Sequence, residues 1–335
     1  MAFSLKEILS GDIRAGARLM RDLDDEIPAA HLALKKLYRH TGRAFILGIT
    51  GAPGAGKSTL VDGIADLLRK QGRSVGIVCI DPTSPFTGGA ILGDRIRMQK
   101  HALDEGVFIR SLATRGHLGG LSKSTIDIVN VMDAMGKDVI IIETVGVGQD
   151  EVEIVKVAHT NLVVVVPGMG DDIQAIKAGI HEIADIFVVN KSDREDSDKT
   201  RRELETMVSM NDYGKDDWVP PVLPAVATTG TGLSDLLGTI ERHRQFVFRE
   251  DNLARYKAGK ARVELLEILK KKLVEKAVED LEKSNLLEPL LEKIANKEED
   301  PYSIVEKVVD HSFAIHLLDG MRNGKGSGKR KGKGR

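Results

Sequence analysis

Short apolar runs rich in β-branched residues recur along the first two thirds of the chain, and stretches with helical apolar spacing separate them. The runs are AFILGIT, SVGIVCI, VFIRSL, DVIIIET, NLVVVVP, DIFVVN and PPVLPAV. Their hydrophobicity is continuous rather than alternating, which indicates strands covered on both faces. The pattern predicts a doubly wound, mostly parallel α/β fold with ligands at the C-terminal ends of the strands.

Helical patterns lie on both sides of the predicted sheet. Residues 3–40 read as two or three short helices, a helix from about Ser234 to Phe248 closes the sheet domain, and another spans about Tyr302 to Leu318. These patterns divide the chain into an N-terminal helical extension (1–40), a sheet domain (41–248), a C-terminal helical arm (249–320) and a tail (321–335).

A long helical pattern, ARVELLEILKKKLVEKAVEDLEK, lies within the arm. It carries a narrow apolar seam formed by Val263, Leu266, Leu269, Leu273, Ala277 and Leu281. The seam could pack onto the protein's own sheet domain. A dimer arm is the favoured interpretation, because a long charged helix with a narrow seam prefers another helix as its partner.

Composition narrows the class of protein. With 335 residues, 41% hydrophobic and 30% charged, the chain has the profile of a globular protein, and its net charge of −1 favours neither nucleic acid nor membrane surfaces. The single cysteine, Cys79, excludes an internal disulfide and is expected to be buried. Without a signal-peptide core or an apolar stretch of membrane-spanning length, the expected location is the cytoplasm.

The C-terminal sequence RNGKGSGKRKGKGR is an exception to this balance of charge. It has nothing to bury, so it is expected to be disordered. A solvated tail is favoured over contact with RNA or an acidic partner.

The sequence GAPGAGKS matches the phosphate-binding loop pattern G-x-x-x-x-G-K-[ST] and stands between a predicted strand and a predicted helix. Such a loop curls its N–H groups around phosphates; its lysine, Lys57, bridges the β- and γ-phosphates, and Ser58 binds Mg²⁺. A chance glycine turn is the disfavoured alternative. A second alternative is an ATPase of the chromosome-partitioning type. Those proteins have an extra lysine where this chain has Ala52, so this alternative is weakened. The candidate nucleotide contacts are Gly51, Ala52, Pro53, Gly54, Ala55, Gly56, Lys57, Ser58 and Thr59.

Three acidic residues are candidates for the magnesium position. Asp81 ends the second predicted strand, and Asp94 follows in a glycine-containing segment, where it could instead cap a helix. The strand DVIIIET brings Glu143, followed by Gly146, in an E-x-x-G version of the GTPase switch motif. Its carboxylate would contact Mg²⁺ through water, and the N–H of Gly146 would sense the γ-phosphate.

The usual water-orienting glutamine is absent after this switch, where the chain has Val147. Intrinsic hydrolysis is therefore expected to be slow. Gln149, Glu151 or a residue from a partner would complete the catalytic set with Lys57 and Glu143. Gln149 and Glu151 could also simply lie on the exposed first turn of the next helix.

A guanine-selecting motif, N-K-x-D, follows the strand DIFVVN. In it Asp193 accepts hydrogen bonds from guanine N1–H and N2–H₂, which adenine does not offer, while Lys191 lies along the base and Asn190 braces the loop. Backbone contacts to guanine O6 are expected from Val226, Ala227 and Thr228. Together the motifs indicate a GTPase that binds GTP or GDP with Mg²⁺.

With these motifs in order, the chain resembles the MeaB/ArgK family of G proteins. The resemblance rests on GAPGAGKST, DPTSPFTGGAILGDRIRM, ETVGVGQDE, VVPGMGDDIQAIKAGI and NKSD, and it covers about Leu5 to Leu318. It implies a G domain of the SIMIBI class and a homodimer formed by the C-terminal arm. It also implies that GTP hydrolysis gates adenosylcobalamin delivery to, and protects, an acyl-CoA mutase such as methylmalonyl-CoA mutase. The family's phosphate, magnesium and guanine positions match Lys57, Ser58, Asp81, Asp94, Glu143 and Asp193.

Two other functions are weighed against this one. A nickel-inserting GTPase would be expected to carry His-rich or Cys-rich segments, and the chain has one cysteine and nine scattered histidines. A kinase linked to basic amino-acid transport would need a catalytic base for a protein hydroxyl, and none is recognisable. No cobalamin-binding D-x-H-x-x-G motif is found, so the mutase is expected to hold the cofactor.

Overall fold

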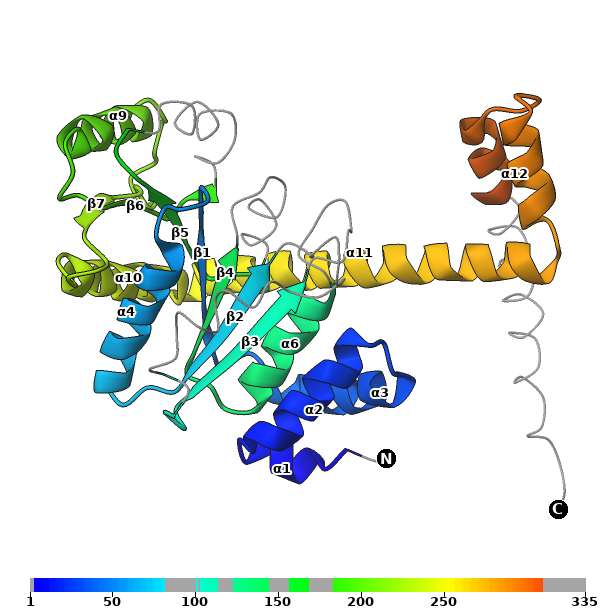
Figure 1. Ribbon diagram of the computed structural model, residues 1–335, viewed down its shortest axis with the longest axis horizontal. Coiled ribbons are helices and arrows are strands. Elements are labelled where there is room, and N and C mark those ends of the chain that lie inside the picture. The colour runs from blue at the N-terminus through cyan, green and yellow to red at the C-terminus, as the bar shows by residue number, and fades with distance from the viewer. Residues whose placement is uncertain are drawn as a thin grey trace, which may run out of the picture. The chain divides into compact units, whose positions relative to one another are not determined.

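A computed structural model describes residues 3–81, 101, 103–113, 123–144, 157–168 and 183–309, apart from the side chains of residues 81, 113, 123, 267 and 271. Within this part of the chain, seven strands form one sheet in the order β3-β2-β4-β1-β5-β6-β7, and every pair is parallel (Figure 1). The strands are β1 (Phe45–Gly51), β2 (Val75–Asp81), β3 (Val107–Ala113), β4 (Val139–Thr144), β5 (Thr160–Val165), β6 (Ile186–Asn190) and β7 (Val222–Ala225). The predicted α/β fold is confirmed.

Helices cover both faces of the sheet. One face packs against α4 (Lys57–Lys70) and α10 (Leu233–Val247), and the other against α6 (Lys123–Ala134) and α9 (Ser197–Ser209). Successive side chains of β1 point to opposite faces of the sheet. Leu47 packs in the core with α4 and α10, and Ile46 packs in the core with α6. This explains why the strands read as continuous apolar runs. Cys79 of β2 is buried, as expected.

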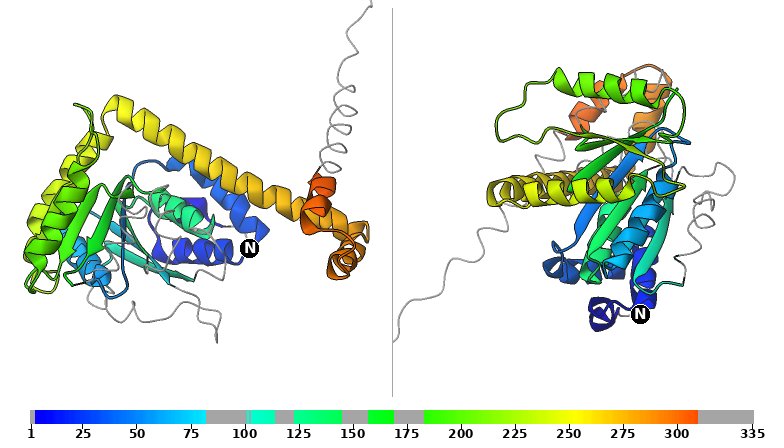
Figure 2. Two further views of the ribbon diagram at one scale, coloured as in Figure 1. Left: turned by 90° about the horizontal axis from the view of Figure 1, so that it is seen from above. Right: turned by 90° about the vertical axis from the view of Figure 1, so that its left-hand side faces the viewer.

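The N-terminal residues form three short helices and a 3₁₀ turn. They are α1 (Leu5–Leu9), α2 (Ile13–Asp24), α3 (Pro28–Leu37) and η1 (Tyr38–His40). Asp12 caps α2 by accepting a hydrogen bond from the N–H of Ala15 at 2.7 Å. Buried residues such as Leu19 and Leu37 pack on α6, so α6 lies between the sheet and these helices (Figure 2).

The chain continues into α11 (Glu250–Lys283) and α12 (Leu287–Ala295), and residues 301–309 are also helical. Two compact units are distinguished, Met1–Val263 and Glu264–Arg335, so the boundary falls inside α11. The helix begins before the predicted seam, and the sequence did not predict α12. The end of the helix predicted to Leu318 lies outside the described residues. No described helix has the length and apolar character needed to cross a membrane.

Candidate functional site

The loop between β1 and α4 lies where the sheet order reverses, since β1 is flanked by β4 on one side and β5 on the other. Such a position is where open α/β sheets bind ligands. Gly51, the last residue of β1, has φ 141°, and a Cβ there would lie 2.1 Å from the carbonyl oxygen of Val164. Gly56 has φ 85° and caps α4 without a side-chain hydrogen bond. The first N–H groups of α4 are therefore arranged to bind an anion.

Lys57 is the first residue of α4 and is only 6% exposed. Its Nζ donates to the carbonyl oxygens of Gly51 and Ala52 at 2.6 and 2.9 Å. A buried ammonium group must be compensated by hydrogen bonds or opposite charge. The loop carbonyls supply part of this compensation, and a phosphate in the loop would supply the opposite charge.

Ser58 and Glu143 meet beside this loop. The Ser58 hydroxyl donates to Oε1 of Glu143 at 2.6 Å, and Glu143 is 5% exposed near the end of β4. The register places Glu143 opposite Ile49 of β1 and Cys79 of β2. A hydroxyl and a carboxylate are the oxygen ligands that Mg²⁺ prefers, so the donor set fits this ion.

A buried hydroxyl pair adjoins the same two strand ends, and the sequence analysis did not single it out. Thr144 Oγ1 donates to Thr50 Oγ1 at 2.9 Å, and neither residue is exposed. Thr144 follows Glu143, and Thr50 precedes Gly51. The only sequence signal is that each threonine stands next to a motif at a strand end.

Asn190 joins the phosphate loop to a second loop. It is the last residue of β6 and 2% exposed; its Nδ2 donates to the carbonyl of Ala55 at 2.7 Å, and its Oδ1 accepts from the N–H of Ala227 at 3.1 Å. Lys191, with φ 55°, donates from Nζ to the carbonyl of Gly54 at 2.8 Å. The N-K-x-D segment and the phosphate loop are thus in direct contact.

The remaining candidates for guanine contact lie in two neighbouring turns. Asp193 is exposed in the turn after β6. Val226, Ala227 and Thr228 follow β7; the N–H of Val226 donates to the carbonyl of Thr231 at 3.0 Å, and that of Ala227 donates to Asn190. Within the described residues, the N–H of Thr228 has no hydrogen-bond partner.

Several predicted site residues are less fully placed. Thr59 is exposed on α4, and Asp81 is the last residue of β2, where only its backbone is described. Asp94, Gly146, Gln149 and Glu151 lie outside the described residues. The structure therefore brings together the phosphate loop, Glu143 and the N-K-x-D segment at one edge of the sheet.

Comparison with known proteins agrees with this arrangement. The sequence model of the family described as methylmalonyl Co-A mutase-associated GTPase MeaB matches residues 17–282. A putative GTPase of Pyrococcus horikoshii is 47% identical over 308 residues, which are 91% of this chain and 96% of that protein. The mouse protein named methylmalonic aciduria type A homolog, mitochondrial, is 31% identical over 234 residues, or 69% of this chain and 56% of that protein.

Among solved structures, the crystal structure of a LAO/AO transport system kinase aligns with a TM-score of 0.66 at 23% identity. The alignment covers 92% of this chain and 95% of that chain. At this identity the likeness shows a shared fold. The family match covers most of the chain and includes the phosphate loop, Glu143 and the N-K-x-D segment. The chain therefore belongs to the MeaB family of P-loop GTPases.

Proposed function

We propose that the chain uses GTP hydrolysis to control adenosylcobalamin loading into a B₁₂-dependent acyl-CoA mutase, methylmalonyl-CoA mutase or a relative, and to protect that enzyme. The observation that carries the proposal is the match of residues 17–282 to a family whose description names association with methylmalonyl-CoA mutase. The mouse relative, whose name refers to methylmalonic aciduria, supports the same assignment.

The phosphates and Mg²⁺ would be held by the loop between β1 and α4. The first N–H groups of α4 and the ammonium of Lys57 would bind the β- and γ-phosphates. Ser58 would exchange its 2.6 Å hydrogen bond to Glu143 for coordination of the ion, and Glu143 would hold the ion through water. Asp81 and Asp94 are further magnesium candidates by sequence. The bound ion would neutralise charge on the phosphates during transfer.

The base would lie beside the N-K-x-D segment. Asp193 would accept from guanine N1–H and N2–H₂, and Lys191 would lie along the ring. Two of the three backbone amides proposed for guanine O6 are already hydrogen-bonded, those of Val226 and Ala227. The N–H of Thr228 is therefore the best candidate among them to donate to O6.

Hydrolysis would depend on residues that follow Glu143. The N–H of Gly146 would sense the γ-phosphate, and Gln149, Glu151 or a residue of the partner would orient the attacking water. Val147 in the usual glutamine position supports slow intrinsic turnover and faster turnover in the complex.

We further propose that the C-terminal arm forms a homodimer. Leu266, Leu269 and Leu273 share one side of α11 and are 41%, 46% and 47% exposed in the single chain. An exposed apolar seam of this kind is expected to be covered by another helix.

Association with the mutase provides the test. The full chain is mixed with a purified methylmalonyl-CoA mutase in the presence of GDP, GTP or a non-hydrolysable GTP analogue, and complex formation is measured by pull-down. We expect the amount of complex to change with the nucleotide, and Lys57→Ala to remove that change. Equal association in every nucleotide state, or no association at all, contradicts the proposed function.

A further inference from the structure

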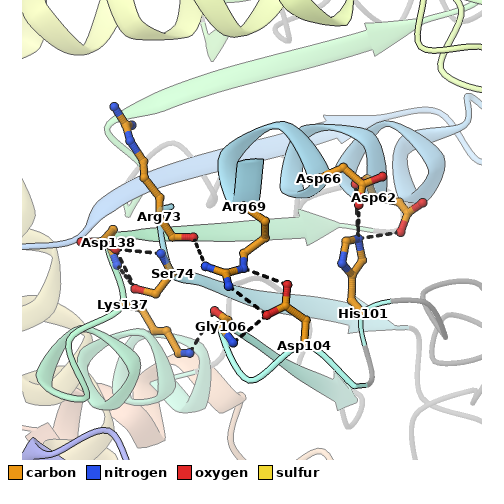
Figure 3. Close-up of polar contacts among 10 residues, drawn as sticks. All are labelled: Asp62, Asp66, Arg69, Arg73, Ser74, His101, Asp104, Gly106, Lys137 and Asp138. Carbon is orange, nitrogen blue, oxygen red and sulfur yellow. Dashed lines mark hydrogen bonds and ion pairs between the residues drawn. The ribbon is translucent and has the colours of Figure 1, made fainter. Parts of the chain in front are cut away.

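A second cluster of polar side chains lies farther along α4. Asp62 and Asp66 are one turn apart on this helix, and both face His101 (Figure 3). Nε2 of His101 lies 2.9 Å from Oδ1 of Asp62 and 3.5 Å from Oδ1 of Asp66. One ligand atom from each residue lies within 4.8 Å of the other two. His101 is 5% exposed, and the two aspartates are partly buried.

This cluster is separate from the proposed magnesium position. Asp62 is four residues after Ser58, and Asp66 eight, which places them about 6 and 12 Å farther along the axis of α4 at the helical rise. Ser58 contacts Glu143, whereas the two aspartates contact His101. One helix therefore carries two groups of possible metal ligands.

The segment that carries His101 is fastened to α4 by a second interaction. Arg69 donates from Nε and Nη2 to the two carboxylate oxygens of Asp104, at 2.9 and 3.0 Å, and Asp104 also accepts from the N–H of Gly106 (Figure 3). Two parallel hydrogen bonds of this kind fix geometry as well as charge. The Arg69–Asp104 pair therefore helps to hold His101 against Asp62 and Asp66.

The distances within the cluster suit a common metal ion. With metal–ligand bonds of about 2.1 Å, two ligand atoms are separated by about 3.0 Å in octahedral and about 3.4 Å in tetrahedral coordination. The separations of Nε2 from the carboxylate oxygens of Asp62 and Asp66, 2.9 and 3.5 Å, are close to these values. A single N–H makes one well-directed hydrogen bond, and a second acceptor at 3.5 Å is too distant for another strong one. A metal ion would engage all three groups at once.

We propose that His101 Nε2 and the Oδ1 atoms of Asp62 and Asp66 bind one first-row divalent transition-metal ion, represented by Zn²⁺. An imidazole ligand favours Zn²⁺ and its neighbours over Mg²⁺ or Ca²⁺, which prefer oxygen ligands alone. Magnesium that accompanies the nucleotide is therefore a weak competitor. Three protein ligands leave one position for water, and binding displaces the proton from Nε2.

The test uses the full chain without an affinity tag, saturated with GDP and Mg²⁺, so that the nucleotide site is filled. Zn²⁺ binding is measured by calorimetry, and Co²⁺ binding by its visible absorption, which reports coordination directly. We expect one equivalent of metal in the wild type. Asp66→Asn and His101→Gln should each weaken binding by more than about tenfold. Removing a residue that only supports a metal ligand already weakens metal affinity by at least about tenfold, and removing a ligand itself should weaken it more.

Controls separate this site from adventitious binding. His31, which lies 3.9 Å from Asp127, is the matched control, and His31→Gln should bind Zn²⁺ like the wild type. Because the buried His101 could be needed for folding, the decisive variant is Asp66→Asn, whose side chain is 39% exposed. Its urea unfolding should match the wild type. The proposal is overturned if Asp66→Asn binds the metal as tightly as the wild type, or if the wild type binds no stoichiometric metal. A loss of GDP affinity in Asp66→Asn also overturns it.

Discussion

At the scale of single residues, Asn190 connects the two loops that the site needs. Its side chain donates to Ala55 in the phosphate loop and accepts from Ala227 after β7. The sequence motif identified Asn190 as a brace, but its partners lie 135 and 37 positions away in the chain. Contacts of this range are set by the sheet order and could not be derived from local spacing.

Replacing Asn190 by alanine should therefore destabilise the nucleotide-free protein. The buried carbonyl of Ala55 and the amide of Ala227 would both lose their partner, and an unsatisfied buried group costs about 2 kcal/mol. Urea unfolding measures the loss. Asn211→Ala, at an exposed position, is the control, and equal stability of the two variants would show that the bridge contributes nothing.

His159 should make the stability of the protein depend on pH. Its Nδ1 accepts from the N–H of Ile46 at 2.9 Å, its ring stacks on Tyr256 at 4.2 Å, and burial lowers its pKa to about 3. Below the usual pKa of about 6.5 the unfolded chain takes up a proton that the folded chain does not. The contribution of His159 to stability is therefore lost as the pH falls from 6.5 toward 3, by about 2 kcal/mol between pH 7 and pH 5.

The variant His159→Gln isolates this contribution, because its amide oxygen can accept from Ile46 but does not titrate. In urea unfolding, the change in stability from pH 7 to pH 5 should be less unfavourable in the variant than in the wild type by about 2 kcal/mol. Burial raises the pKa of Asp185 to about 7, which acts in the opposite direction, and the comparison of variant with wild type cancels it. The same pH dependence in both proteins would refute the assignment.

At the scale of elements, the sequence predicted all seven strands but not every helix. The strands were readable because the sheet is covered on both faces, so most of them are continuous apolar runs. The start of α11 was not predicted, because residues 250–260 carry few apolar side chains. The signal present there is electrostatic: Glu250 and Asp251 lie in the first turn, where negative charge suits a helix N-terminus. The helix α12 was not predicted either. It has no buried residue, so it lacks the core-facing apolar stripe by which a helix is recognised in a sequence.

The end of β1 is where packing between elements limits substitution most sharply. A Cβ on Gly51 would meet the backbone of Val164 in β5, whereas Gly72, with φ 77° after α4, has open space around it. Gly72→Ala should cost about 1 kcal/mol for its backbone conformation alone. Gly51→Ala should cost about 3 kcal/mol because the strands must also move apart. Thermal unfolding of both variants checks the difference, and similar losses would contradict it.

At the scale of the whole molecule, topology explains why motifs scattered along the sequence form one site. Parallel strands place the ends of β1, β4, β6 and β7 at one edge of the sheet, so the phosphate loop, Glu143 and the N-K-x-D segment converge there. The order of motifs in the sequence was enough to predict this convergence. The hydrogen bond from Ser58 to Glu143, and those from Lys57 to the carbonyls of Gly51 and Ala52, required the structure.

The homodimer proposed for the arm can be tested by introducing charged side chains into the apolar seam of α11. The double variant Leu269→Lys with Leu273→Lys should be a monomer, because two ammonium groups could not be buried against a second helix. Glu282→Lys adds positive charge nine residues after Leu273, half a turn away from the seam, and should remain dimeric. Sedimentation or light scattering decides, and a monomeric wild type would refute the dimer.

We propose that the phosphate loop and the carboxylate of Asp193 together select a guanine nucleotide, and the function proposed for the chain depends on this selection. Calorimetric titration of the nucleotide-free chain with GTP and with ATP, each with Mg²⁺, tests it most directly. We expect GTP to bind and ATP to bind at least about a hundredfold more weakly, since adenine lacks the N–H groups that Asp193 would pair. Asp193→Asn should remove most of this preference, whereas ATP binding as tightly as GTP in the wild type would contradict the account.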